Sequence, residues 1–371
     1  MSAPSPLDLV AAEAEKLIAD GHAPGVQVCV RAGGAMALSR GYGYANLETR
    51  TPMSDQSVLR IASNTKSFTA ALILRQVDAG RVRLDDRLAK YVPKFPGSEA
   101  ITIAHLITNT SGLGTFPSPA TLPDPRAIAA AFASVRSAED AVDVLIGLPG
   151  HQLFEPGAHW SYSNFGYLLL GAVLEGVEGR PFSQCLRDLT ASLGLSRTAA
   201  DQASEVVPGR AAAYGAVPQA PGGFINLLVD SSLLGAAGAM RSTSEEMCLW
   251  MEALLSGRVL SPAMTTFALS PGLTEGGVLP APLPGAINPP VVSRDGKVRY
   301  GAGLSLEDPE TGAPWAWHMG LLGGAISAMR RHREVDAGYA FVLNGTPGQV
   351  NTTAPIGPLM QALDAAALAC A

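Results

Sequence analysis

The stretch that most constrains the fold of this chain is a serine and a lysine placed just ahead of an apolar helical pattern. Ser63 and Lys66 stand three residues apart, and the following TAALILRQVDA carries apolar residues at helical spacing up to a stop at Gly80. Side chains three apart on a helix share one face, and a serine at a helix N-terminus lies among unpaired N–H groups that stabilise an oxyanion. The pattern predicts a nucleophilic serine on the first turn of a buried helix of about four or five turns, with Lys66 managing its proton.

A second short pattern supplies candidate partners for this serine. Tyr162-Ser163-Asn164 stands directly before a strongly helical run, and a tyrosine near a lysine can act as a base because the cation lowers its pKa. The Asn164 side chain offers both a donor and an acceptor to a substrate amide. The competing interpretation is structural: Tyr162 packs in the core, and Asn164 caps a helix that begins near Phe165.

The third pattern is His318-Met319-Gly320-Leu321, at the end of the strand-like stretch PWAWH. A strand that carries a polar residue and then a glycine can lie beside a nucleophile and offer backbone N–H groups to an oxyanion. The competing interpretation is an ordinary histidine at a strand end. Each of the three motifs is short enough to arise by chance, so their combination carries the argument.

In this order and spacing the three motifs resemble those of the serine β-lactamase and penicillin-binding-protein superfamily. The resemblance is closest to the branch of class C β-lactamases, D-alanyl-D-alanine carboxypeptidases, D-aminopeptidases, D-amino-acid amidases and related esterases. Further sequence segments typical of the family lie at 105–114, 155–182 and 235–257. The resemblance implies a β-lactamase/transpeptidase-like fold and chemistry through an acyl-enzyme.

The resemblance also implies a role for each motif residue. Ser63 would be the nucleophile, and Lys66 and Tyr162 would share the work of general base, with the order of their proton transfers left open. Asn164 would hold the amide side chain of the substrate. The backbone N–H groups of Ser63 and Leu321 would form the oxyanion hole.

Two departures from the family pattern shift the expected substrate. His318, which with Gly320 would line the substrate pocket, replaces the lysine usual in β-lactamases, and Met319 replaces a small hydroxyl residue. A histidine is only fractionally charged near neutral pH, which weakens the case for an anionic β-lactam or a free carboxylate. We therefore expect a serine hydrolase acting on small amides, D-amino-acid peptides or esters. The alternatives are a class C-like β-lactamase or D-alanyl-D-alanine carboxypeptidase, an acyltransferase, and a non-catalytic ligand-binding homologue.

The patterning predicts an α+β fold in which an antiparallel sheet is flanked by helices and a mostly helical lobe is inserted. Strand signals lie near both ends of the chain. Residues 25–46 are predicted to form a hairpin with a turn at Gly33-Gly34, and further strands are predicted at 301–307, 314–318, 325–331 and 339–344. Helices are predicted at 6–20, after a cap at Ser242, Thr243 or Ser244, and at 354–369, and a long surface loop is expected at 270–299. We expect residues 1–80 and 216–371 to form the sheet domain, 81–215 the helical domain, and the active site to lie between them.

Composition and charge exclude several classes of binding partner. The net charge is −6 with no basic cluster beyond Arg330-Arg331-His332-Arg333, so nucleic acid is not expected. The longest apolar run, 167–174, is too short to span a bilayer, and the four cysteines lack the paired spacing of a metal site. The N-terminus lacks the basic-then-apolar order of a signal peptide. We expect a cytoplasmic enzyme with free thiols, no metal or cofactor, no membrane partner, and a small-molecule or short-peptide substrate.

Overall fold

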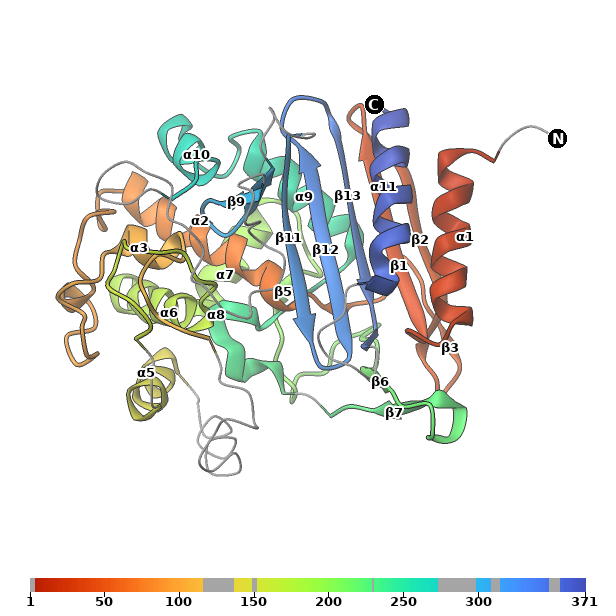
Figure 1. Cartoon of the computed structure of the whole chain (residues 1–371), viewed down its shortest axis with the longest axis horizontal. Helices are drawn as coiled ribbons and strands as arrows, with labels where there is room; N and C mark the ends of the chain where they lie inside the picture. The colour runs from red at the N-terminus through yellow and green to blue at the C-terminus, as the bar shows by residue number, and fades with distance from the viewer. Residues whose placement is uncertain are drawn as a thin grey trace.

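The fold is built around one eight-stranded antiparallel sheet. The computed structural model describes residues 4–115, 137–148, 152–228, 230–272, 298–307, 314–346 and 354–371. The strands are β1 (Gly25–Ala32), β2 (Ala35–Asn46), β3 (Thr51–Pro52), β9 (Val298–Tyr300), β10 (Ser305–Glu307), β11 (Trp315–Leu322), β12 (Ala325–His332) and β13 (Ala337–Leu343). Their order is β3-β2-β1-β13-β12-β11-β10-β9, so N-terminal strands lie beside C-terminal ones (Figure 1). The expected α+β fold, with one sheet assembled from both ends of the chain, is confirmed.

Strand β1 shows that the sheet is buried on both faces. Val26, Val28 and Val30 pack into the hydrophobic cluster on one face, whereas Cys29 packs into the cluster on the other. The turn to β2 is a two-residue hairpin, and Gly33 (φ 57°) and Gly34 (φ 76°) supply the positive φ angles that such a turn needs. The predicted hairpin at 25–46 is therefore confirmed.

The two terminal helices, α1 (Pro6–Ala19) and α11 (Gly357–Ala369), pack side by side over one face of the sheet (Figure 1). Helix α1 begins with a capping box, in which the Ser5 hydroxyl accepts from the Asp8 backbone and the Asp8 carboxylate accepts from the Ser5 backbone. Gly21 has φ 73° just after the helix. Both predicted terminal helices are present, and a short 3₁₀ turn, η6 (Ala354–Ile356), precedes α11.

The opposite face is covered by α9 (Ser244–Leu255), which contacts β1, β12 and β13. Thr243, one of the three expected caps, accepts a hydrogen bond from the Glu246 backbone at 3.2 Å. Helix α9 packs against α2 (Thr65–Asp78). The Trp250 ring of α9 stacks on Phe68 with centroids 3.8 Å apart, and its indole N–H donates to the Ser67 hydroxyl at 2.9 Å. This packing fixes the helix that follows Ser63.

In the sequence, the segment between the N-terminal and C-terminal strands of the sheet forms the helices α3 (Ile103–Ile107), α5 (Ala138–Gly147), α6 (Asn164–Glu178) and α7 (Phe182–Ser192), which lie to one side of the sheet (Figure 1). Each lies where the sequence predicts a helical pattern, although α3 is short because Asn109, just beyond its end, has φ 60°. The division into domains at residues 80 and 215 stays a prediction. None of the helices in the described part of the chain is long and apolar enough to cross a bilayer.

Two small sheets and several short elements complete the described fold. One sheet has the order β4 (Leu59–Arg60), β8 (Met240–Ser242) and β5 (Ala199–Ala200), and the other β14 (Gly345–Thr346), β6 (Tyr214–Ala216) and β7 (Phe224–Asn226). Two short helices are α8 (Gly235–Gly238) and α10 (Pro262–Ala268). Most of the loop expected at 270–299 lies outside the described residues, but β9 already begins at Val298.

Two predicted strands have different limits in the structure. Strand β11 continues past the predicted 314–318 to Leu322, which places the whole third motif inside the sheet. Strand β10 is shorter than the predicted 301–307, because Gly301 donates to the Leu304 carbonyl and Gly303 has φ 71° in a turn.

Candidate active site

Ser63 lies in η1 (Ala62–Asn64), a single 3₁₀ turn between β4 and α2. Helix α2 itself begins two residues later, so the prediction that Ser63 occupies the first turn of the α-helix is wrong in detail. Ala62 has φ 46°, a left-handed conformation that a residue other than glycine rarely adopts. Such strain persists where the surroundings hold it, and it is concentrated at functional sites.

Two buried polar side chains hold this turn against the sheet. The Asn64 amide donates to the Ile61 carbonyl at 3.1 Å and to the Ser327 hydroxyl of β12 at 2.7 Å. The Ser327 hydroxyl in turn donates to the Ile61 carbonyl at 2.8 Å. Ser63 is therefore positioned by a strand more than 260 residues away in the sequence.

The Lys66 side chain is buried completely and reaches three oxygens. Its Nζ lies 3.2 Å from Ser63 Oγ, 2.7 Å from Asn164 Oδ1 and 2.7 Å from the Ala237 carbonyl. The last two atoms only accept hydrogen bonds, so they take the two N–H bonds of a neutral amine and leave its lone pair toward Ser63. Burial also lowers the pKa of Lys66 well below its ordinary value. The arrangement suits a lysine that receives a proton from Ser63.

Asn164 is the first residue of α6 but does not cap it. The N-cap is Ser163, whose hydroxyl accepts from Gly166 at 2.9 Å and donates to the Gly114 carbonyl at 2.9 Å. The Asn164 amide group instead donates to Thr115 Oγ1 at 2.6 Å while its oxygen accepts from Lys66. The structural interpretation of Asn164 as a helix cap is thus wrong, and its side chain belongs to the site around Ser63.

Tyr162 lies against both Ser63 and Lys66. The Lys66 Nζ is 4.7 Å from the centroid of the Tyr162 ring, and the phenol is buried. Burial raises the pKa of Tyr162 far above its ordinary value, and the hydrogen bond with Ser63 offsets this only in part. The expectation that Lys66 lowers the pKa of the phenol is wrong, because the effect of burial outweighs every contact that favours the phenolate.

Strand β11 approaches the nucleophile turn closely at Gly320. A Cβ atom on Gly320 would lie 2.2 Å from the Ile61 carbonyl oxygen, 2.5 Å from Ser327 Oγ and 3.1 Å from Ala62 Cβ. No side chain fits there without moving the strand or the turn, so glycine is required by close approach.

The register of the β11–β12 hairpin sets the direction of the backbone groups beside Ser63. Leu322 pairs with Ala325 across a two-residue turn, so Leu322, Gly320 and His318 bond to β12, and the alternate residues point to the outer edge. Strand β10 pairs with this edge only at Ala316 and Trp317, and within the described residues no strand pairs with it beyond that point. The backbone N–H of Leu321 therefore points to an open edge that faces the turn of Ser63.

His318 is buried and uncharged. Its Nδ1 lies 2.6 Å from the Met319 carbonyl oxygen, and its Nε2 lies 3.1 Å from the hydroxyl of Tyr300 in β9. Burial, and secondly the proximity of Lys66, lower the pKa of His318 to about 3. The expectation of a fractionally charged histidine at neutral pH is wrong, and both ring nitrogens bond to protein atoms.

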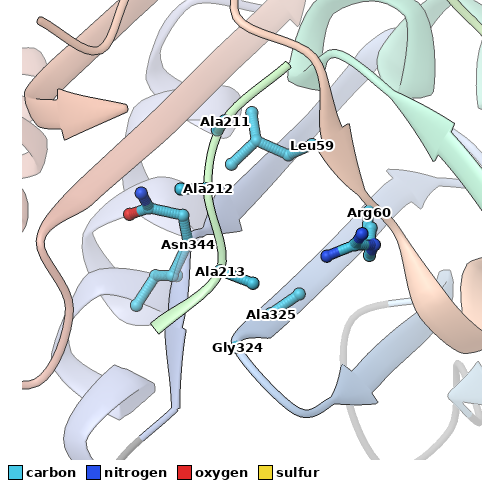
Figure 2. Close-up of a pocket in the computed structure, with 9 residues that line it drawn as sticks. Leu59, Arg60, Ala211, Ala212, Ala213, Gly324, Ala325 and Asn344 are labelled. Atoms are coloured by element: carbon cyan, nitrogen blue, oxygen red, sulfur yellow. The ribbon is translucent and has the colours of Figure 1, made fainter. Parts of the chain in front are cut away.

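The tip of the β11–β12 hairpin lies beside a small pocket (Figure 2). A Cβ atom on Gly324 would lie 2.5 Å from that of Ala213, so the tip packs directly on the segment before β6. Arg60, three residues before Ser63, also lines this pocket, and its Nε donates to Asp201 at 2.8 Å. Small side chains and this ion pair fix the tip of the strand that passes Ser63.

The structure thus gathers Ser63, Lys66, Tyr162 and Asn164 in one place, with the third motif beside them. Sequence reasoning missed Asn64, Ser327 and Tyr300, which hold the turn and the histidine. Asn64 lies inside the first motif, and Ser327 is a polar residue in the apolar run AISAM, so each carries a weak signal. For Tyr300 the sequence carries no signal, because it lies in a three-residue strand next to a segment without periodicity.

Comparison with known proteins agrees with this geometry. A model of the family "Beta-lactamase" matches residues 10–356, which is nearly the whole chain. The chain belongs to the beta-lactamase family. Among curated relatives, Protein flp of Staphylococcus aureus (strain MW2) is 33% identical over 174 residues, or 45% of this chain and 33% of that protein. Penicillin-binding protein 4* of Bacillus subtilis (strain 168) is 31% identical over 162 residues, or 42% and 33%. Each match spans about a third of the relative's length.

Solved structures of this family share the fold over almost the entire chain. D-amino acid amidase from Ochrobactrum anthropi SV3 superposes with a TM-score of 0.77 at 24% identity, covering 97% of this chain and 98% of that one. A D-stereospecific amidohydrolase from Streptomyces sp. gives 0.75 at 23% identity, with 97% and 98% covered. The octameric penicillin-binding protein homologue from Pyrococcus abyssi gives 0.75 at 22% identity, with 91% and 73% covered. At these identities the likeness is one of fold.

Proposed function

We propose that this member of the beta-lactamase family is a serine hydrolase that forms an acyl-enzyme on Ser63 and acts on small, uncharged amides, D-amino-acid peptides or esters. The observation that carries the proposal is the position of Lys66, whose buried amine lies 3.2 Å from Ser63 Oγ while two acceptors occupy its N–H bonds. Nucleophilic catalysis by serine requires such an adjacent base.

In the acylation step, Ser63 Oγ attacks the substrate carbonyl carbon and its proton moves to Lys66 Nζ. The C–N or C–O bond of the substrate then breaks, and the amine or alcohol leaves with a proton relayed from Lys66. Lys66 is the better first base because its neutral form is favoured by burial, whereas the raised pKa of Tyr162 keeps that phenol protonated. Tyr162 then serves as a donor near Ser63, suited to pass the proton toward the leaving group. Water then attacks the acyl carbon, the bond from that carbon to Ser63 Oγ breaks, and a proton from the water returns to Oγ as the acid leaves.

The oxyanion formed in each step would be stabilised by the backbone N–H groups of Ser63 and Leu321. The hairpin register directs the Leu321 N–H to the open edge of β11, and Gly320 allows that edge to approach the turn of Ser63. Removing one such donor in other hydrolases costs about 10²–10³ in rate. Asn164 would bond the amide of the substrate when the substrate displaces its contact with Thr115.

The preference for an uncharged substrate rests on His318. Family members with a lysine at this position carry a fixed cation, whereas the neutral ring here offers no charge to a carboxylate. Two of the structurally similar proteins are named a D-amino acid amidase and a D-stereospecific amidohydrolase, which supports an amide of a D-amino acid as the substrate class.

The experiment that tests this proposal has two parts. A fluorophosphonate probe is expected to add its mass to Ser63 in the wild type and in Ser256→Ala, a serine variant at the end of α9, but not in Ser63→Ala. A panel of D- and L-amino-acid p-nitroanilides, p-nitrophenyl esters and nitrocefin then ranks the substrates. Folded wild type that is not labelled would refute the acyl-enzyme, and nitrocefin as the best substrate would refute the preference for uncharged amides and esters.

A further inference from the structure

Tyr300, which lies outside the three motifs, contacts His318 of the third motif. Tyr300 is buried, and its hydroxyl lies 3.1 Å from His318 Nε2, with the two rings edge to face at 5.9 Å. It comes from β9, the edge strand of the sheet, and its ring also packs on Trp160 at 5.7 Å. No other role in the proposed reaction uses this hydroxyl.

The contacts of His318 fix which nitrogen carries its proton. The Met319 carbonyl only accepts hydrogen bonds, so the 2.6 Å contact with Nδ1 requires a proton on Nδ1. In a neutral ring Nε2 is then an acceptor, so in the proposed arrangement the Tyr300 hydroxyl, which also contacts Tyr167 and Asn109, donates to it. The ionisable groups that face the ring are Lys66 from α2, Tyr162 from the segment before α6, and Tyr300 itself, and none of them is a carboxylate that would favour the imidazolium.

The bond to the Met319 carbonyl affects the edge strand that the substrate meets. Met319 and Leu321 are alternate residues of β11, so both direct their backbone groups to the same open edge. An unpartnered carbonyl there would present a negative dipole close to the developing oxyanion. The Nδ1–H group of His318 donates to that carbonyl and holds this edge of β11 in one conformation.

We propose that Tyr300 is a positioning residue, which holds His318 as the neutral Nδ1–H tautomer and thereby keeps the Met319 carbonyl bonded and the Leu321 N–H directed at the oxyanion. The effect on rate rests on the proposed function. The tautomer does not, because it is a property of the free protein.

The first experiment reads the tautomer directly, by ¹⁵N NMR of the His318 ring in the wild type at pH 7. The expected spectrum shows a protonated Nδ1 and an unprotonated Nε2, and it changes in Tyr300→Phe. An imidazolium or an Nε2–H tautomer in the wild type would overturn the proposal, whatever the variant does. This measurement needs neither a substrate nor a variant that folds.

The second experiment measures kinetics on the best ester or amide substrate. Tyr300→Phe is expected to lower kcat on the order of 10-fold, less than the loss of a whole oxyanion donor, with KM within about twofold. Because Nε2 without its donor is easier to protonate, kcat of this variant is expected to show an additional loss in acid, separate from the limb set by Lys66 and at a pH above the wild-type His318 pKa of about 3. The control is Tyr339→Phe, which removes a buried hydroxyl on the α11 face of the sheet and should keep both the rate and the pH profile. A rate and profile of Tyr300→Phe equal to those of this control would overturn the proposal.

The two proposals fail in different ways. If Ser63 is not labelled by a fluorophosphonate, the acyl-enzyme is wrong, but the tautomer can still be observed. If Ser63 is labelled and His318 shows another tautomer, the acyl-enzyme stands and the role of Tyr300 falls.

Discussion

Gly320→Ala gives the sharpest test of how the sheet positions the nucleophile. The added Cβ would lie 2.2 Å from the Ile61 carbonyl oxygen and 2.5 Å from Ser327 Oγ, whereas real carbon–oxygen contacts need about 3.2 Å or more, a little under the usual 3.5–4.0 Å between carbons. Either β11 or the turn of Ser63 must therefore move by about 1 Å. Overpacking of this kind costs about 1–3 kcal/mol of unfolding free energy, and a 1 Å misplacement at a catalytic site costs on the order of 10²-fold in rate.

The matched control is Gly176→Ala, the same chemical change in the last turn of α6. A Cβ on Gly176 meets no atom within 4 Å, so the variant should gain about 0.5–1 kcal/mol from helix propensity and keep its activity. Urea unfolding gives the stability of each variant, and kcat/KM with the rate of fluorophosphonate labelling gives the reactivity of Ser63. Wild-type stability and labelling in Gly320→Ala would refute the claim that β11 positions the turn.

Three further predictions follow from the same contacts. Ser327→Ala should lower the unfolding free energy by about 1–3 kcal/mol in thermal unfolding, because it leaves the buried Asn64 amide with one partner fewer. Asn164→Leu should reduce kcat/KM by 10-fold or more, on the order of one lost catalytic hydrogen bond, because Lys66 loses an acceptor that holds its lone pair toward the serine. A kcat/KM equal to that of the wild type would contradict this prediction. The pH profile of kcat/KM should fall as pH decreases through the lowered pKa of Lys66. His318→Gln should leave that limb in place, because a group with a pKa of about 3 does not set it.

The lowered pKa of Lys66 also has a consequence for stability, with a definite sign. Between the lowered pKa of folded Lys66 and the ordinary value of about 10.4, the unfolded chain binds a proton at Lys66 that the folded chain does not. The contribution of this group to stability therefore increases with pH from its folded pKa up to its unfolded value. Burying the base in neutral form thus makes the fold less stable at neutral pH than a matched apolar residue would, a cost often seen at active sites.

Local patterns predicted the elements around the site well, because each rests on chemistry within a few residues. The N-terminal helix, the hairpin within 25–46 and the Thr243 cap are all confirmed. The motif residues Ser63 and Lys66 were also readable, because their spacing on adjacent turns is itself a local property. The same local reasoning placed Ser63 one turn too far into the helix.

What the sequence did not reveal depends on burial and on contacts between distant segments. The pKa directions of Tyr162 and His318 differ from the expectation because a sequence does not state how completely a side chain is removed from water. The contact of Ser327 with the turn of Ser63 spans 266 positions to Ile61, and no periodicity encodes it. Tyr300 likewise reaches His318 only through the pairing of β9, β10 and β11.

The burial of Lys66 and His318 side by side explains why the third motif can carry a histidine at all. When Ser63 transfers its proton, Lys66 becomes the first positive charge in the cluster, next to the oxyanion that forms at the same moment. A second cation at position 318 would repel it and would raise the free energy of that ion pair in a site with little water. A neutral His318, bonded to Met319 and Tyr300, avoids this repulsion but gives up the attraction for a substrate carboxylate. The same feature that eases proton transfer to Lys66 therefore selects against anionic substrates, which ties the choice of base to the choice of substrate.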